Sequence, residues 1–245
     1  RTFDIGGDKF VSSLLVPKDM NPALGLRAVR LGLARPDIFV TQLRGMIRAS
    51  AHGQLRVMVP MIASLGELRA VRILFERALA EVDAAGHARA RHVPLGMMVE
   101  VPSAAIMAAE FAREAEFFSV GTNDLVQYAL AVDRASPELA YLASFYDPAV
   151  LRLIATVIRA GHDHDRPVGL CGAMASDQLA AVLLVGLGLR ELSMEPSAIP
   201  AAREAIGAVT LAEATEAARA ALQELTAAEV ERYLVRRFAD RLDIE

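Results

Sequence analysis

Two acidic residues and one cysteine stand at the ends of short apolar runs in this sequence. Glu100 is the next-to-last residue of the run 95–101, Asp124 follows the run 117–120, and Cys171 is the last residue of the run 168–171. Burying an unpaired carboxylate costs free energy. Glu100 is therefore either paired with a nearby arginine or bound to a cation, and the spacing alone leaves both possibilities open.

The two carboxylates are 24 positions apart, a separation at which one strand–helix unit would place Asp124 beside Glu100. Two carboxylates, completed by water and a phosphate oxygen, suit Mg²⁺, which binds few protein ligands. Zinc is less well matched because the five histidines show no metal-binding spacing with Cys171. The sequence predicts a magnesium site at Glu100 and Asp124.

The segment 121–124, Gly-Thr-Asn-Asp, precedes a predicted helix over 125–132. An Asn or Asp at this position commonly caps a helix. Free amides at a helix start, together with the Asn123 side chain, can also hold an anion. The two interpretations are compatible.

Four cations lie in or next to loops that follow predicted strands: Arg1, Lys9, Arg27 and Arg134. Arginine binds carboxylate or phosphate groups through two parallel hydrogen bonds, although a surface arginine is often merely solvated.

Cys171 has two interpretations as well. A lone cysteine is usually a small buried apolar residue, but at a strand end before Gly172 it is a candidate acid or nucleophile.

The elements that must position these residues alternate between strand and helix. This order predicts an α/β domain with a parallel sheet, and ligands bind at the carboxyl ends of such strands. A closed (β/α)8 barrel needs eight strands, so either two units precede Arg1 or the sheet is open. The six predicted strands cover residues 2–5, 55–60, 95–101, 117–120, 168–171 and 191–194. The predicted helices cover 23–50 (in more than one piece), 65–85, 103–114, 125–132, 148–162 and 177–187, with two more in 211–241.

Composition narrows the class of protein. The chain has 245 residues, of which 54% are hydrophobic and 23% charged, with a net charge of −4; these values are typical of a folded globular domain. No basic cluster indicates a nucleic-acid partner, and the apolar runs are shorter than the roughly 18 residues of a membrane span. With one cysteine and no signal peptide, we expect a cytoplasmic protein.

Six segments, taken together, resemble enzyme I of the sugar phosphotransferase system, the phosphoenolpyruvate-protein phosphotransferase family. They occur in the order and with the spacing of that family, from Arg1 to about residue 194. The segments are 1–9 (Arg-Thr-Phe-Asp-Ile-Gly-Gly-Asp-Lys), 21–30 (Asn-Pro-Ala-Leu-Gly-Leu-Arg-Ala-Val-Arg), 98–102 (Met-Val-Glu-Val-Pro), 118–125 (Phe-Ser-Val-Gly-Thr-Asn-Asp-Leu), 131–134 (Ala-Val-Asp-Arg) and 169–172 (Gly-Leu-Cys-Gly).

The resemblance implies a fold and a set of roles. The fold would be the (β/α)8 TIM barrel of the phosphoenolpyruvate/pyruvate superfamily, with the first two βα units missing from this chain, and residues 1–245 would form one domain. Glu100 and Asp124 would hold Mg²⁺, and Cys171 would protonate the enolate to give pyruvate. The implied substrate-binding residues are Arg1, Lys9, Arg27, Asn123, Asp124 and Arg134.

The resemblance also implies partners outside this sequence. The phosphoryl group of phosphoenolpyruvate (PEP) would pass to a histidine on an upstream domain and then to the carrier protein HPr, and the barrel would form a homodimer. The protein would be either a stand-alone enzyme I or one barrel of a fused multiphosphoryl transfer protein.

Three positions depart from the family pattern. Ala173 replaces the usual Glu after Cys171-Gly172, Ser176 replaces a usual Gly, and Asp147 stands where many relatives have His. The lost carboxylate at Ala173 puts the proton network beside Cys171 in doubt. Two alternatives stay open: another PEP/pyruvate enzyme, such as pyruvate phosphate dikinase or PEP synthase, which shares several of these motifs, and a regulatory relative that senses PEP, which only the change at Ala173 favours.

Overall fold

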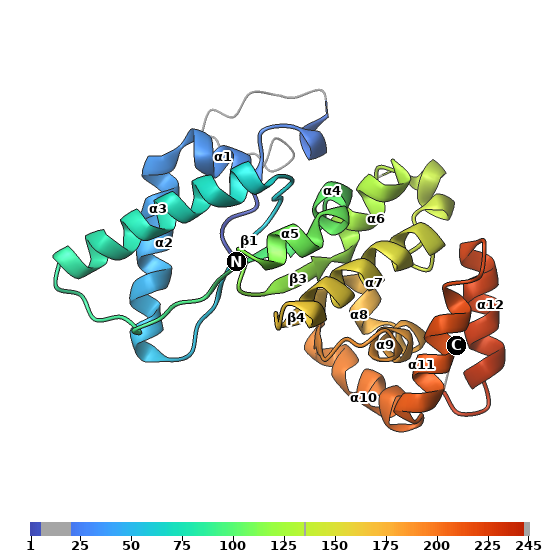
Figure 1. The fold of residues 1–245 in the computed structure, drawn as a ribbon. Helices are drawn as coiled ribbons and strands as arrows, with labels where there is room; N and C mark the ends of the chain where they lie inside the picture. The colour runs from blue at the N-terminus through green and yellow to red at the C-terminus, as the bar shows by residue number, and fades with distance from the viewer. Residues whose placement is uncertain (6–20, 135, 243–245) are drawn as a thin grey trace. The chain divides into compact units, whose positions relative to one another are not determined.

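The computed structural model describes residues 1–5, 21–134 and 136–242 of the chain (Figure 1). Its internal contacts divide the chain into two compact units. The first unit contains residues 1–98 and 114–117, and the second contains residues 99–113 and 118–245. Each unit has its own buried apolar core.

In the first unit, helices precede a short parallel strand pair, and one helix connects its two strands. The elements are η1 (Pro22–Leu24), α1 (Ala28–Ala34), α2 (Pro36–Ala49), η2 (Ser50–His52), β1 (Val57–Val59), α3 (Leu65–Ala84) and β2 (Leu95–Val99), whose last residue belongs to the second unit. β1 pairs with β2 in parallel, with Val57 opposite Leu95. Helix α2 packs against α3, and α3 begins with a capping box in which Ser64 and Glu67 bind each other's backbone N–H groups.

The strand predicted over residues 2–5 is wrong. Thr2 N–H donates to the carbonyl of Met58 in β1 at 2.9 Å, which is the beginning of a strand pairing. The next backbone donor, Phe3 N–H, binds the side-chain oxygen of Gln42 at 3.1 Å instead. Residues 2–5 therefore make one backbone hydrogen bond to β1 without forming a strand.

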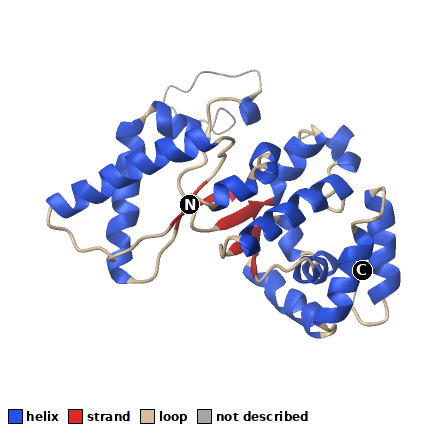
Figure 2. Cartoon of the chain, viewed as in Figure 1, coloured by secondary structure: helices blue, strands red, loops and turns tan. Residues whose placement is uncertain are grey.

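The second unit contains three short parallel strands, β3 (Phe118–Gly121), β4 (Val168–Cys171) and β5 (Glu191–Ser193) (Figure 2). β3 pairs with β4 so that Gly121 is opposite Cys171, and β4 pairs with β5 so that Cys171 is opposite Ser193. Parallel strands need crossover connections, and helices provide them here. The register places the carboxyl ends of β3 and β4 level with each other.

The helices of the second unit make most of its core. They are α4 (Pro102–Ile106), α5 (Ala108–Ala112), α6 (Thr122–Leu130), η3 (Pro137–Leu142), α7 (Pro148–Asp163), α8 (Ala173–Ser176), α9 (Gln178–Gly186), η4 (Pro196–Ala198), α10 (Ile199–Gly207), α11 (Leu211–Ala221) and α12 (Ala227–Phe238). Helix α9 is buried from Leu179 to Leu184, because α10 and α11 both pack against it.

The predicted fold class, α/β with parallel strands and crossover helices, is confirmed. Five of the six predicted strands are present among the described residues, within two residues of the predicted bounds at either end. The organisation of the chain as one barrel domain stays a prediction. In the part of the chain that the structure describes, no helix combines the length and the apolar character needed to cross a bilayer.

Candidate active site

Hydrogen bonds join the carboxyl ends of β3 and β4 at the predicted site. The Thr122 hydroxyl donates to the carbonyl oxygen of Cys171 at 3.0 Å. The Ala173 N–H donates to the side-chain oxygen of Asn123 at 3.2 Å. The first turn of α6 is therefore fastened to the turn that leads from β4 into α8.

That turn depends on Gly172. Its φ is +113°, in a region that side chains other than hydrogen rarely adopt. A Cβ at this position would collide with the hydroxyl of Thr122 and lie 3.0 Å from the amide oxygen of Asn123. Glycine is required both by the backbone conformation and by the close approach of α6.

The thiol of Cys171 is held by two groups of β3. The hydroxyl of Ser119 donates to Sγ at 3.6 Å, and Sγ–H points to the carbonyl oxygen of Val120 at 3.5 Å. Cys171 is partly exposed. It is therefore a positioned thiol that a ligand can reach, rather than a fully buried core residue.

Asp124 lies in the first turn of α6 and is 5% exposed. Its Oδ1 forms an ion pair with Arg134 Nη1 at 3.6 Å, and the Arg134 side chain is 49% exposed. The loop that carries Arg134 is fixed where α6 ends, because Arg134 N–H donates to the side-chain oxygen of Gln127 at 3.2 Å. A buried carboxylate thus faces a cation that is also open to solvent.

Glu100 follows β2 directly and is 2% exposed. It precedes α4, and α4 packs against α6, which carries Asp124 in its first turn. Two buried carboxylates therefore lie at the starts of two contacting helices. Among the described residues no group of three or more His, Cys, Asp or Glu side chains gathers as metal ligands. A pair of carboxylates is the donor set of Mg²⁺, which keeps several waters, and does not fit Zn²⁺.

The predicted substrate cations in the first unit have different surroundings. Arg27 is buried and forms an ion pair with Asp4, with Nη2 2.9 Å from each carboxylate oxygen. Arg1 is exposed, and Lys9 lies outside the described residues. The structure thus brings Asn123, Asp124 and Arg134 together with the turn after Cys171, and the roles of all the predicted site residues stay predictions.

A second contact that holds the segment after Cys171 was not predicted from the sequence. The hydroxyl of buried Tyr146 donates to Asp177 Oδ1 at 2.5 Å, and the same oxygen caps α9 by accepting from Ala180 N–H at 2.8 Å. Burial, reinforced by the negative charge of Asp177, raises the pKa of Tyr146 far above its usual value. Asp177 directly follows α8, so this hydrogen bond fixes the far end of the short helix after Cys171.

Ser119 and Thr122 were missed as well. Ser119 is the one polar side chain in β3, and a polar residue within a buried strand is the signal that could have identified it. Nothing in the sequence around Thr122 indicates its contact, because its hydroxyl bonds to a strand residue 49 positions away.

The family whose sequence model matches this chain is described as PEP-utilising enzyme, PEP-binding domain, and the match covers residues 1–211. The chain belongs to this family. The motifs around Glu100, Asn123, Asp124, Arg134 and Cys171 all lie within the matched residues.

Several curated relatives carry the name phosphoenolpyruvate-protein phosphotransferase. The protein from Listeria monocytogenes serovar 1/2a is 46% identical over 94% of this chain and 40% of its own length. The protein from Bacillus subtilis (strain 168) is 47% identical over 87% of this chain and 38% of its own length. The protein from Latilactobacillus sakei is 44% identical over 97% of this chain and 42% of its own length. The chain therefore spans about two fifths of these relatives.

A solved structure supports the fold. The crystal structure of a citrate lyase from Burkholderia xenovorans LB400 matches with a TM-score of 0.52 at 19% identity, covering 84% of this chain and 70% of that chain. At this identity the match concerns the fold alone.

Proposed function

We propose that this chain is the PEP-binding part of a phosphoenolpyruvate-protein phosphotransferase, enzyme I of a sugar phosphotransferase system. The observation that carries the proposal is the buried Asp124, in ion-pair contact with the half-exposed Arg134, on a helix start that is fastened to the Cys171–Ala173 turn. Relatives with that name, 44–47% identical to this chain, support it.

In this proposal Glu100 and Asp124 hold Mg²⁺. The ion, when bound, neutralises charge on the carboxylate and phosphate groups of PEP. Arg134 approaches Asp124 at 3.6 Å, longer than a hydrogen bond, so its guanidinium can turn toward a substrate anion. Asn123 contacts the substrate beside it, and Arg1, Lys9 and Arg27 supply further positive charge. Positioning and charge neutralisation are what phosphoryl transfer requires of a protein.

Cys171 is the proposed acid. Once the phosphoryl group has left PEP, the enolate of pyruvate needs a proton on carbon: the S–H bond of Cys171 breaks, a C–H bond forms, and a thiolate remains. The Ser119 hydroxyl, which donates to Sγ at 3.6 Å, can stabilise that thiolate. Because Ala173 offers no carboxylate, we propose that water returns the proton to the partly exposed Cys171.

We propose that the other components lie outside this chain. They are two further βα units that complete the barrel, an upstream domain with the phosphorylated histidine, and HPr as the next acceptor. We also propose that the barrel forms a homodimer and that the protein works in the cytoplasm.

The test uses the full-length protein with PEP labelled in its phosphoryl group, Mg²⁺ and no nucleotide. The proposal predicts a protein-bound label that is acid-labile and alkali-stable, as a phosphohistidine is, and release of one pyruvate for each label. The label should then move to HPr. A labelled protein that passes its label to AMP, forming ATP when inorganic phosphate or pyrophosphate is supplied, and not to HPr, would be a dikinase or synthase instead. A protein that binds PEP without releasing pyruvate would be a sensor.

A further inference from the structure

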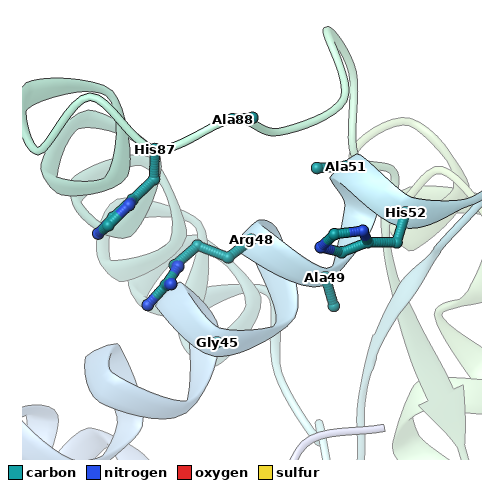
Figure 3. Close-up of a pocket in the computed structure, with 7 residues that line it drawn as sticks. All are labelled: Gly45, Arg48, Ala49, Ala51, His52, His87 and Ala88. Carbon is teal, nitrogen blue, oxygen red and sulfur yellow. The ribbon is translucent and has the colours of Figure 1, made fainter.

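A hollow of about 390 Å³ lies within the first unit, where the C-terminal end of α2, helix η2 and the loop after α3 meet (Figure 3). Glycine and alanine make its walls apart from three basic side chains, Arg48, His52 and His87. The small residues leave the hollow open, and the side chains able to donate hydrogen bonds are all basic. Its volume is in the range of small-molecule sites.

The charges near this hollow are unbalanced. The carboxylates in the last turn of α3 are already paired with arginines that do not line the hollow. Glu81 is held by Arg44 at 2.9 Å and by Arg77 at 2.7 Å, and Asp83 is held by Arg89 at 2.7 Å.

The basic side chains of the hollow have no such partners. Within the part of the chain that the structure describes, Arg48, His52 and His87 form no ion pair with a carboxylate. The guanidinium of Arg48, without a neutralising acid, creates a locally positive potential in this concave site.

We infer that this hollow binds a compact phosphate-bearing anion. In Figure 3 the side chains of Arg48 and His87 extend in the same direction from α2 and from the loop after α3, and the ring of His52 lies near the backbone at Ala49. The planar guanidinium of Arg48 can donate two parallel hydrogen bonds to phosphate oxygens. An imidazole carries at least one N–H donor in either protonation state, so His87 adds a donor beside Arg48 and His52 adds one from η2. The inference does not depend on the proposed function.

The test uses inorganic phosphate as the probe and the full-length protein with histidine rings labelled for NMR, at constant ionic strength. The ring signals of His52 and His87, assigned with His52→Gln and His87→Gln, should shift and saturate as phosphate is added. The exposed His162 should not follow them. Arg48→Glu should weaken phosphate binding by about tenfold or more, as expected for a lost charged contact. Arg48→Gln should give a smaller change in the same direction.

The matched control is Arg159→Glu, which reverses an exposed arginine on α7 and should leave the titration unchanged. Shifts that do not saturate, or that appear equally at His162, would overturn the inference. So would equal losses in Arg48→Glu and Arg159→Glu. Shifts that vanish in Arg134→Ala but survive in Arg48→Glu would assign phosphate binding to the proposed PEP site instead.

Discussion

The side chains of Ser119 and Cys171 meet across two neighbouring parallel strands, with Oγ donating to Sγ at 3.6 Å. The thiol hydrogen is directed at the carbonyl of Val120, 3.5 Å from Sγ. The same strand therefore supplies a donor that can stabilise a thiolate and an acceptor that orients the thiol. This pairing distinguishes Cys171 from a cysteine that only fills space in a core.

Replacing Cys171 should separate two steps of the reaction. In Cys171→Ala, transfer of the phosphoryl group to the protein should persist in part, because it needs no acid at carbon. Pyruvate release should slow by about 10²–10⁴-fold, the usual contribution of general acid catalysis. Single-turnover assays of label transfer and of pyruvate release measure both steps. Equal losses in both rates, or no loss in either, would mean that Cys171 is not the proton donor.

Gly172→Ala should destabilise the protein. Forcing a side chain into φ +113° costs about 1–3 kcal/mol, and the new Cβ meets Thr122 and Asn123 in addition. Denaturant unfolding measures the change. The control is Gly45→Ala in α2, where nothing lies within 4 Å of the added Cβ and helix propensity favours alanine by about 1 kcal/mol. If the two variants had the same stability, the tight turn after Cys171 would be absent in solution.

Because of Tyr146, the free energy of unfolding should depend on pH in the alkaline range. The pKa of this residue is raised in the folded state by burial and by Asp177, so its contribution is fully present below the unfolded value of about 10 and is lost as pH rises beyond it. The free energy of unfolding should fall above pH 10 by up to about 1.4 kcal/mol per pH unit from this group.

Tyr146→Phe should lower stability at neutral pH by about 1–2 kcal/mol through the lost hydrogen bond and should flatten the alkaline decline. Tyr141→Phe is the control, because Tyr141 is 78% exposed and its replacement should leave the wild-type profile intact. If Tyr146→Phe kept the wild-type slope above pH 10, the buried Tyr146–Asp177 hydrogen bond would be refuted.

Arg27 should matter for stability as well as for the proposed binding of PEP. It forms a buried pair with Asp4, and removing one partner of such a pair costs about 3–5 kcal/mol. Arg35→Ala is the control, since it breaks a similarly bidentate but exposed pair with Asp37 and should cost much less, because exposed ion pairs contribute little to stability. Equal unfolding free energies for Arg27→Ala and Arg35→Ala would show that the Asp4 pair contributes little.

The sequence predicted elements well where the local pattern was strong. The run Met-Met-Val before Glu100 is buried throughout, as expected for a parallel strand, and helix α3 begins at its capping-box serine. The predicted helix over 103–114 is instead two helices, α4 and α5, which meet at Met107. No glycine or proline marks that break, and both helices pack against α7, so tertiary packing decides it.

The residues of the candidate site could be proposed from the sequence, but the contacts that hold them could not. Glu100, Asp124 and Cys171 could be proposed because their residue types are unusual at strand ends, whereas Arg134 follows helix α6 and was proposed from the family motif. The contacts that fix them could not, because Thr122–Cys171, Asn123–Ala173 and Tyr146–Asp177 join residues 31–50 positions apart. Propensity and periodicity describe neighbours along one element, whereas these hydrogen bonds depend on how elements meet.

The magnesium dependence of PEP binding tests the central claim most directly. Calorimetry on the full-length protein should show that Mg²⁺ strengthens PEP binding in the wild type, and that Glu100→Gln and Asp124→Asn each abolish this gain. Asp163→Asn, which neutralises an exposed carboxylate at the end of α7, should retain it. If Glu100→Gln and Asp124→Asn both kept the full magnesium dependence, these two residues would not be the metal site, and the proposed active site would be wrong.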